Sequence, residues 1–526
     1  MNKRLAIVGC GSSGLITLKT AIDFLPDWEI VCFEKTNSIV GCWGNRHPGF
    51  VSTSTKFTTQ FACFPIFDAN VVDDAGQSRS EFFQNDQYGQ YLESFADNFN
   101  LHDHISLGTC AEQLILDGDK WQLIVDGETR TFDAVIVCTG LAAKPKSIEC
   151  EVEQLPVTEL NHPDGLNHIT NRKIVVVGGG ESAVDYADRL SKPELNNEVL
   201  LSLHSGVRVS PRYHPVRGVP SDFLRNRLML SVHPDIRNYL GQVFVELRIK
   251  YERQFHNLFP GNHSETNELE SERNLRREWT MRLTAAAKDD LFNMFHNKSD
   301  DSLNNVGKGR IKIVGPPIDN LWNEFEAFEN TESESIPFAA DLVVPGIGYE
   351  STLDALTGET ISVDDFFLGC CHTKHDNLFA VGFARPIIGN IPTISEMQAR
   401  LICSSLAGKT DRPKNIEQLH DADKQKSAQR FAKIDLSAVY PVEMFPYCDR
   451  LAKLMGLKPE PGFFKSPLNW WRTQTSPATT MHYFEDSSIR KRLKTSSRHM
   501  PWTLVSFILL MKPVDWLWKL WNRLKS

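Results

Sequence analysis

A glycine-rich turn near the start of the chain has the spacing of a dinucleotide-binding site. It reads GCGSSG at residues 9–14, which is G-x-G-x-x-G. Gly9 permits a tight turn, Gly11 lets the backbone approach a pyrophosphate, and Gly14 lets a helix pack closely on the preceding strand. Exposed N–H groups and the helix dipole would hold the phosphates. The pattern predicts a bound dinucleotide, with Ser13 among its contacts.

The acid expected of such a site follows at the correct distance. The apolar segment 29–33 is followed by Glu34, which lies 20 residues after Gly14. A carboxylate there can accept hydrogen bonds from ribose hydroxyls, and its charge would repel a 2′-phosphate. The first turn therefore suits FAD or NAD and not NADP, and we include the neighbouring Lys35 in the predicted site.

A second glycine-rich turn lies about 170 residues further along the chain. It reads GGGESA at residues 178–183, with Ala183 in place of the third glycine. Alanine is tolerated there because the position needs only close helix packing. The predicted contacts of a second dinucleotide are Gly178, Gly180, Glu181 and Ser182.

The surroundings of the second turn favour NADPH. The next apolar segment, residues 198–203, ends near His204 and carries no acid at its tip. Arg208 and Arg212 follow, and arginine suits a 2′-phosphate. We therefore assign NADPH to the second turn, with both arginines as predicted contacts.

Regular elements on either side must position the two turns. Apolar runs at residues 4–8 and 173–177 predict buried parallel strands. Residues 15–24 and 184–190 are typical of the helices that follow such strands. The strand–turn–helix order is the context that the glycine pattern requires.

Two such turns in a chain of 526 residues predict an α/β fold with two Rossmann-like dinucleotide-binding domains, one inserted in the other. The segments 133–140, which contains Thr139 and Gly140, and 340–349 are the expected crossings between them. The expected ranges are 1–165 and 340–455 for the FAD domain, 166–339 for the NADPH domain with a helical insertion, and 456–526 for a C-terminal region.

Composition excludes several other classes of protein. The formal net charge is −9, which gives no general attraction to nucleic acid. The eleven cysteines include no C-x-x-C pair, which argues against a zinc site and a disulfide framework and favours reduced thiols. The N-terminus lacks the layout of a secretory signal. We expect no bound metal and no nucleic-acid partner.

The C-terminal residues have the pattern of a membrane-surface anchor. A basic cluster at 490–498 precedes the apolar stretch 501–511, which is too short to span a bilayer. After Pro513, tryptophans and leucines share one helical face and cations share the other. We expect a peripheral or monotopic attachment on the cytoplasmic side of a membrane. The alternative is a helix pair that packs on the protein or on a partner subunit, as in a homodimer.

Taken together, these motifs resemble those of the flavin-containing monooxygenases. The resemblance rests on GCGSSG at 9–14, VGCW at 40–43, DAVIVCTG at 133–140, VVGGGESAVDYA at 176–187 and the segment 377–400. It implies that the last segment returns to the FAD domain and closes over the flavin, with Gly382 and Gln398 among its contacts. It also implies that Trp43 belongs to the cofactor site.

The resemblance implies an NADPH-dependent oxygenase. NADPH would reduce FAD, and the reduced flavin would react with O2 to give a flavin hydroperoxide that oxygenates a nucleophilic nitrogen or sulfur of a small or lipophilic substrate. Thr53, Lys56 and Gln60 are the polar residues expected near the reacting flavin. Many members have an asparagine where Thr53 aligns, and His204 replaces an arginine expected at the 2′-phosphate.

Other functions stay open at this point. The histidine motif F-x-G-x-x-x-H, frequent in the family, is not matched around His162, which argues against a Baeyer–Villiger oxygenase acting on ketones. An NADPH oxidase that releases hydrogen peroxide is a further alternative, because Thr53 has no amide. A non-enzymatic membrane-bound flavoprotein, acting as a scaffold or sensor, is the last.

Overall fold

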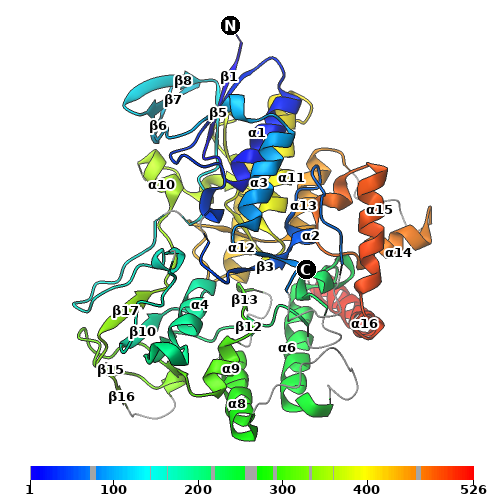
Figure 1. Cartoon of the computed structure of the whole chain (residues 1–526). Helices are drawn as coiled ribbons and strands as arrows, with labels where there is room; N and C mark the ends of the chain where they lie inside the picture. Colours follow the sequence, from blue (N-terminus) through cyan, green and yellow to red (C-terminus); the bar gives the residue numbers. More distant parts are fainter. Residues whose placement is uncertain are drawn as a thin grey trace.

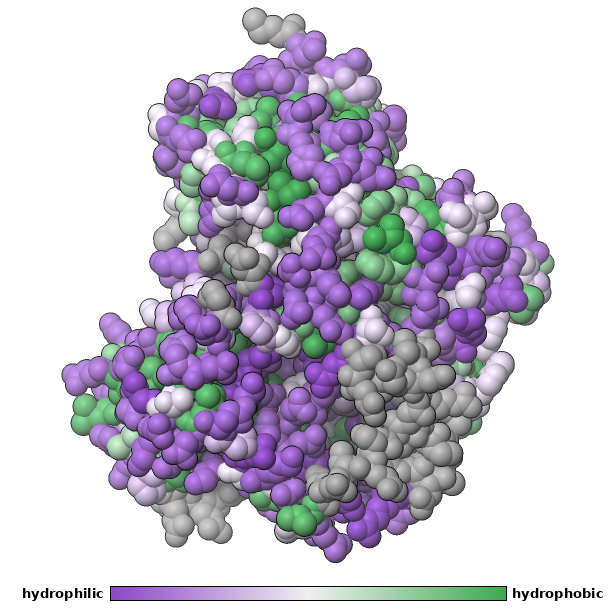
Figure 2. All heavy atoms as spheres, viewed as in Figure 1, coloured by the Kyte–Doolittle hydropathy of each residue, from purple (hydrophilic) through white to green (hydrophobic). Residues whose placement is uncertain are grey.

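The computed structural model describes residues 2–44, 46–70, 79–142, 144–162, 164–214, 219–254, 269–287, 293–330, 335–358, 360–457 and 464–525. Two α/β units follow one another vertically in Figure 1, and a helical C-terminal region lies at their side. The surface of the face drawn in Figure 2 is mostly hydrophilic, and hydrophobic residues form separate patches on it.

The first unit contains a seven-stranded sheet in the order β18-β19-β20-β9-β1-β2-β5. Strands β1 (Arg4–Val8), β2 (Glu29–Phe33), β5 (Ile105–Ser106), β9 (Ala134–Val137) and β20 (Leu378–Ala380) are parallel. Strands β18 (Phe366–Phe367) and β19 (Cys371–His372) add an antiparallel edge.

The two faces of this sheet are covered differently. Leu5 and Ile7 pack with α1 (Ser12–Phe24), α3 (Gln87–Asn98) and α11 (Ile391–Leu406). Ala6 and Val8 face the antiparallel strands β6 (Ala111–Asp117), β7 (Lys120–Val125) and β8 (Glu128–Phe132), together with α10 (Thr352–Thr357). The alternation along β1 explains why the whole run is apolar.

The second unit contains a parallel sheet in the order β14-β11-β10-β17. These strands are β10 (Lys173–Val177), β11 (Glu198–Ser202), β14 (Ile311–Val314) and β17 (Leu342–Pro345). Helices α4 (Glu181–Leu190), α8 (Glu270–Ala286) and α9 (Ser302–Gly307) cover one face. The fold class is therefore the predicted one, with two parallel-stranded dinucleotide-binding units.

Both expected domain boundaries need correction. Val157 and Leu160 pack in the core of the second unit, before the expected boundary at residue 165. Strand β17 pairs with β10 of the second unit, after the expected boundary at residue 339. The chain crosses between β9 and Val157 and returns between β17 and α10, because a parallel strand belongs to the sheet whose hydrogen bonds it completes.

Shorter elements join the two units and the C-terminal region. They are β3 (Val51–Thr55), α2 (Lys56–Thr59), β4 (Phe82–Gln84), β12 (Val209–Ser210), α5 (Arg227–Leu230), α6 (Pro234–Lys250), β13 (Asn297–Lys298), β15 (Glu324–Phe325), β16 (Ile336–Pro337), β21 (Ala384–Ile388), α12 (Ile416–Arg430), β22 (Tyr440–Glu443), α13 (Met444–Leu454), α14 (Pro467–Thr475), α15 (Ser487–Ser496) and α16 (Trp502–Lys525).

The C-terminal residues form one helix and not the helix pair that was the alternative to a membrane anchor. α16 continues through Pro513 as one helix of 24 residues. Its buried residues Val505, Ile508 and Met511 pack against residues 219–236 and the start of the C-terminal region. Trp516, Leu517, Leu520 and Trp521 are exposed. Among the described helices, none is long and apolar enough to cross a membrane.

Candidate functional site

The first turn is built so that three backbone segments meet. Gly9 has φ +96°, and a Cβ there would lie 2.8 Å from the carbonyl oxygen of Cys138. A Cβ at Gly14 would overlap the carbonyl oxygen of Gly9. These two glycines therefore let β1, β9 and α1 approach one another, as the motif predicts.

Gly11 has a different environment. A Cβ at Gly11 would meet the Cα of Gly41 at 3.5 Å, an ordinary contact. The first N–H groups of α1 have no partner within the helix. Beside them, the buried hydroxyl of Tyr88 lies close to the Ser12 side chain but makes no hydrogen bond of good geometry with a described residue. A donor, free N–H groups and an unfilled glycine position fit the pyrophosphate of FAD.

Glu34 lies directly behind this turn. Its Oε2 accepts from the backbone N–H of Cys10 at 2.8 Å, and its Oε1 accepts from the N–H and hydroxyl of Thr36 at 3.0 and 2.9 Å. The carboxylate is thus fixed at the end of β2, where the ribose was predicted. Lys35 is exposed.

The returning segment meets the first turn at Ser13. Gly382 has φ +93°, and a Cβ there would overlap the Ser13 hydroxyl. That hydroxyl pairs with Ser395 of α11 at 2.9 Å. Gln398 accepts from the N–H of Gly382 at 3.1 Å and donates to the Tyr447 hydroxyl at 2.8 Å. Ser13 and Gln398 therefore join the two parts of the first unit.

Three further predicted residues lie around the same turn. Trp43 packs edge-on against Tyr88, with ring centroids 4.7 Å apart. The Thr139 and Thr352 hydroxyls pair at 2.7 Å, and Thr352 also donates to the carbonyl of Gly140 at 2.8 Å. Gly140 has φ +78°, and no atom lies within 4 Å of the position of a Cβ.

The second turn repeats the architecture of the first. Gly178 has φ +110°, and a Cβ there would overlap the carbonyl oxygen of Gly346. Ala183 replaces the third glycine because its neighbour is itself Gly346, where a Cβ would lie 2.6 Å from that of Ala183. A Cβ at Gly180 would approach Gly346 no closer than 3.9 Å, so this position stays open for a ligand. The turn fits the pyrophosphate of NADPH.

The two arginines predicted to contact the 2′-phosphate lie in different places, and each donates hydrogen bonds to other residues of the protein. The Arg208 guanidinium is buried and donates to Gln242 at 2.5 Å and to the carbonyl of Ala287 at 2.8 Å. It therefore points into the helical insertion and not toward a ligand. Arg212 lines the junction of the units, but it donates to the Val51 and Ser52 carbonyls at 2.7 and 3.0 Å.

The structure separates the three residues expected near the reacting flavin. Thr53, on β3, is half-buried and lines a cleft between the units, and no described residue hydrogen-bonds to its hydroxyl. Lys56 is half-buried; burial lowers the pKa of its ammonium, although Glu81 opposes the shift. Gln60 is fully buried, and its amide pairs with the backbone of Phe67 at 2.7 and 2.8 Å. Gln60 thus holds a loop together and does not face the cleft.

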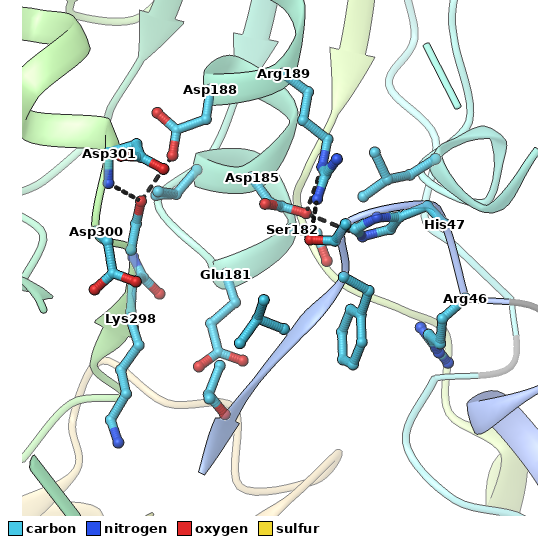
Figure 3. Close-up of a pocket in the computed structure, with 18 of the residues that line it drawn as sticks. Arg46, His47, Glu181, Ser182, Asp185, Asp188, Arg189, Lys298, Asp300 and Asp301 are labelled. Atoms are coloured by element: carbon cyan, nitrogen blue, oxygen red, sulfur yellow. Dashed lines mark hydrogen bonds and ion pairs between the residues drawn. The ribbon is translucent and has the colours of Figure 1, made fainter. Parts of the chain in front are cut away.

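The cleft has a volume of about 870 Å³ and lies between α4 and the loop before β3. Predicted residues that line it are Trp43, Thr53, Glu181, Ser182 and Arg212. Figure 3 shows the face of α4 turned toward this loop. His47 Nε2 lies 3.3 Å from Asp185 Oδ2, and Arg189 donates to the carbonyls of Pro48 and Gly49 at 3.2 and 3.3 Å.

Hydrogen bonding overcomes burial at Asp185. Burial alone would raise the pKa of this carboxyl, but the partners His47 and Arg189 hold it below its ordinary value. Asp185 therefore stays ionised and joins the two units across the cleft.

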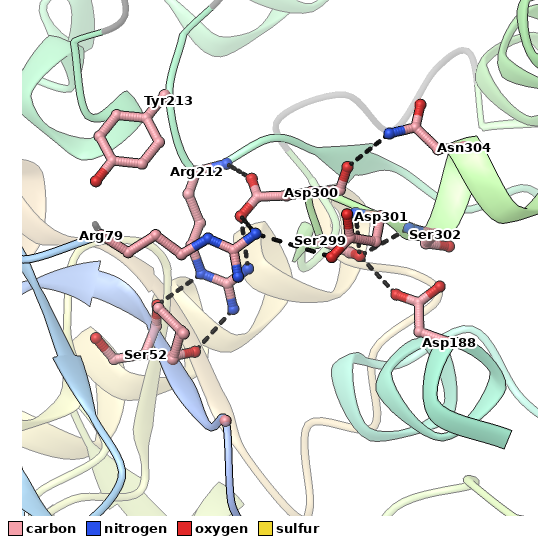
Figure 4. A network of polar contacts seen from close by, with 12 residues as sticks. Ser52, Arg79, Asp188, Arg212, Tyr213, Ser299, Asp300, Asp301, Ser302 and Asn304 are labelled. Carbon is pink, nitrogen blue, oxygen red and sulfur yellow. Dashed lines mark hydrogen bonds and ion pairs between the residues drawn. The ribbon is translucent and has the colours of Figure 1, made fainter. Parts of the chain in front are cut away.

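A second network joins the units at β3 (Figure 4). Asp300 accepts from Arg212 at 3.2 Å and lies 3.4 Å from Arg79. Beside it, Asp188 accepts from the Ser299 hydroxyl at 2.7 Å. Burial raises the pKa of Asp188 to about 7, more than these hydrogen bonds lower it. The cleft thus contains one carboxyl that titrates near neutral pH.

Three residues of the site carried no recognisable signal in the sequence. Tyr88 lies in the first turn of α3, Asp222 in a short 3-10 turn, and Lys298 on a two-residue strand. Lys298 and Glu181 extend toward the same end of the cleft in Figure 3. Only the tertiary contacts identify these residues, because no local spacing marks them.

Comparison with known proteins agrees with this architecture. A family model described as flavin-binding monooxygenase-like matches residues 2–485. A 4-hydroxybenzoate brominase (decarboxylating) of Pseudoalteromonas luteoviolacea is 24% identical and aligned over 89% of this chain and 87% of its own. The N-oxide-forming dimethylaniline monooxygenase 2 of Mus musculus is 25% identical over 92% of this chain and 88% of its own.

A solved structure shows the same fold. The S-allyl-L-cysteine S-oxygenase from Allium sativum superposes with a TM-score of 0.57 at 15% identity, covering 95% of this chain and 98% of its own. The family match over most of the chain and the two nucleotide turns lead to one conclusion: this chain belongs to the flavin-binding monooxygenases and is an FAD- and NADPH-dependent oxidoreductase of that family.

Proposed function

We propose that the enzyme inserts one oxygen atom of O2 into a nucleophilic nitrogen or sulfur of a small or lipophilic substrate. NADPH supplies a hydride, which carries two electrons, and one proton comes from solvent. Together they reduce the second oxygen atom to water, and the substrate becomes an N-oxide or S-oxide. FAD, when bound, supplies the oxygen-activating chemistry. The chain's own residues bind both dinucleotides and limit the access of water.

The observation that carries this proposal is the position of Thr53. It lies on β3 at the junction of the FAD and NADPH units and lines the cleft, and no described residue hydrogen-bonds to its hydroxyl. A nitrogen or sulfur lone pair needs no side-chain base to react with an electrophilic oxygen. A partly buried cleft lined by a hydroxyl, with no base required, therefore fits heteroatom oxygenation.

The names of two similar proteins support this substrate class. One is a dimethylaniline monooxygenase that forms N-oxides, and the other is an S-oxygenase. Ketone oxygenation and release of hydrogen peroxide are the two competing outcomes.

The test compares the amount of each product with the amount of NADPH consumed. FAD-loaded enzyme is mixed with NADPH, O2 and either N,N-dimethylaniline, methyl phenyl sulfide or cyclohexanone. We expect oxide of the amine or sulfide in near-stoichiometric amount with NADPH oxidised. Lactone from the ketone alone would instead indicate a Baeyer–Villiger oxygenase, and peroxide as the sole product would indicate an oxidase.

We also propose that α16 attaches the enzyme to the cytoplasmic surface of a membrane. Its exposed face includes Trp516, Leu517 and Trp521, and Lys519 and Arg523 lie beside them on the helix. Tryptophans with flanking cations suit the lipid headgroup boundary. Pairing of two such faces in a homodimer is the competing explanation.

A further inference from the structure

Strand β3, which carries Thr53, is held at both ends by side chains of the inserted unit. At its start, Arg212 donates to the carbonyls of Val51 and Ser52 at 2.7 and 3.0 Å. At its end, Asp222 Oδ2 accepts from the N–H and the hydroxyl of Thr55 at 2.8 and 2.9 Å. Both contacts cross from one nucleotide unit to the other.

The strand's own hydrogen bonds leave Thr53 unsupported. In the β3–β4 pair, Val51 lies opposite Gln84 and Thr55 opposite Phe82, with an irregularity in the register between them. Thr53 lies within that irregular stretch. Its position is therefore set by what holds the two ends of β3, because the ladder does not continue through it.

Asp222 is the stronger of the two supports because it is buried and collects three donors on one oxygen. It is 6% exposed. The Thr58 hydroxyl, in the first turn of α2, is the third donor at 2.6 Å. Hydrogen bonds to a carboxylate are stronger and more directional than those to a neutral oxygen. One carboxylate thus fixes the end of β3 and the start of α2 together.

The charge of Asp222 is balanced by cations of its own unit. Oδ1 has no hydrogen-bond partner among the described residues. Burial lowers the pKa of both Lys298 and Arg225, and the nearby Asp222 carboxylate opposes this shift at each. Lys298 is 9% exposed, and its ammonium also has no described partner. Burial lowers the pKa of Lys298 to about 8, so its ammonium balances the negative charge of Asp222 only in part.

We infer that Asp222 is a positioning residue for the oxygenation step: from the NADPH unit, it fixes the β3–α2 turn so that the Thr53 hydroxyl faces the reaction cleft. The inference rests on the proposed function in taking Thr53 as the polar group beside the reacting atoms. It links the placement of the inserted unit to the exclusion of water from the oxygenation step.

The experiment uses FAD-loaded Asp222→Asn enzyme, which keeps the side-chain shape but removes the charge. NADPH-reduced protein is mixed with O2 in the presence of NADP, and the return of the flavin absorbance is followed. A misplaced Thr53 should let the flavin reoxidise without transferring oxygen to a substrate. Because small misplacements beside a reacting centre change rates by up to about 100-fold, we expect reoxidation at least about tenfold faster than wild type. The rate of flavin reduction by NADPH should stay unchanged.

Two further variants keep the test decisive. Thr58→Val removes one of the three donors without changing shape, and a smaller acceleration is expected. Asp449→Asn is the control, because Asp449 likewise accepts several hydrogen bonds, from Arg227 and Tyr483, and none of its hydrogen bonds with described residues reaches β3. Its reoxidation should equal that of wild type even if its melting temperature falls.

The outcomes separate the two proposals. Wild-type reoxidation rates in both Asp222→Asn and Thr58→Val would overturn the positioning inference. Acceleration in Asp449→Asn equal to that in Asp222→Asn would also overturn it, because general loosening would then explain the effect. Absence of any oxygenated amine or sulfide with wild-type enzyme would overturn the proposed function, while the reoxidation comparison still decides the role of Asp222.

Discussion

Gly11 and Gly180 occupy the same place in their two turns, and each leaves room for a methyl group within the protein. The added Cβ would lie 3.5 Å from Gly41 in the first case and 3.9 Å from Gly346 in the second. Substitution at either position should therefore leave the fold intact and affect the ligand alone. This differs from Gly14, where a Cβ would overlap backbone.

The Gly11→Ala variant should fold and come out without its yellow colour. Its methyl would collide with the FAD pyrophosphate, and a clash costing about 1–3 kcal/mol weakens binding roughly 5- to 150-fold. The measurement is flavin absorbance per protein after purification. Gly180→Ala is the matched control, since it should keep FAD and lose affinity for NADPH. A bright yellow Gly11→Ala protein would mean that FAD occupies a different turn.

Asp188 makes the stability of the chain depend on pH. Its folded pKa of about 7 lies above the ordinary value of 3.8. Between those values the folded chain holds a proton that the unfolded chain releases, so its contribution is complete below about pH 4 and is lost as the pH rises through 7. Asp188→Asn should therefore match wild type in melting temperature at about pH 4 and exceed it by a few degrees at pH 8. Equal melting temperatures at pH 8 would show that the carboxyl is not buried as described.

At the scale of elements, α16 has two faces with different tasks. Val505 and Ile508 pack into the core beside residues 219–236, so deletion of the whole helix would expose that core. The exposed face can be changed separately. Leu517 is 57% exposed and Trp521 is 60% exposed.

The double variant Leu517→Glu/Trp521→Glu should lose binding to vesicles that contain anionic lipid. Each apolar side chain buried in lipid contributes about 1.5–3 kcal/mol, so affinity should fall more than about tenfold. Co-sedimentation measures this, with Ile318→Glu on the second unit as the control. Unchanged sedimentation, together with a shift from dimer to monomer, would assign the face to a subunit contact.

Much of the element order could be predicted from the sequence, because buried parallel strands and glycine turns leave local signals. β1, β2 and β10 have the predicted bounds. Helices α1 and α4 begin three residues earlier than expected, because Gly11 and Gly180 are their N-caps. The sequence analysis described the residues before and after Pro513 separately, whereas α16 continues through this proline as one helix.

The site itself was predictable only in part. Glycine positions follow from local geometry, so the two turns could be located. Arg208 could not be assigned, because nothing local shows that Gln242 and Ala287 receive its guanidinium. Asp222 and Lys298 were missed for the same reason: their partners are far away in the sequence.

At the scale of the whole molecule, the two nucleotide units meet across a cleft joined at few points. Arg189, on α4, donates to the carbonyls of Pro48 and Gly49 in the first unit. Its loss should loosen the cleft without affecting either sheet. The two dinucleotides must approach each other across this junction for a hydride to be transferred.

Arg189→Ala should therefore weaken NADP binding to the FAD-loaded enzyme about threefold, since exposed ion pairs and hydrogen bonds contribute about 0.5–1 kcal/mol. Calorimetric titration with NADP measures the change. Arg172→Ala is the control, because Arg172 makes comparable contacts with Glu153 and Asp341 inside the second unit. Equal effects of both variants would indicate that the contact between units has no special role.

The most direct test of the account is the fate of the oxygen. Wild-type enzyme with FAD, NADPH and ¹⁸O-labelled O2 is given N,N-dimethylaniline or methyl phenyl sulfide, and the products are analysed by mass spectrometry. We expect one ¹⁸O atom in each N-oxide or sulfoxide and little hydrogen peroxide. Unlabelled substrate recovered unchanged, with peroxide accounting for the NADPH consumed, would contradict it.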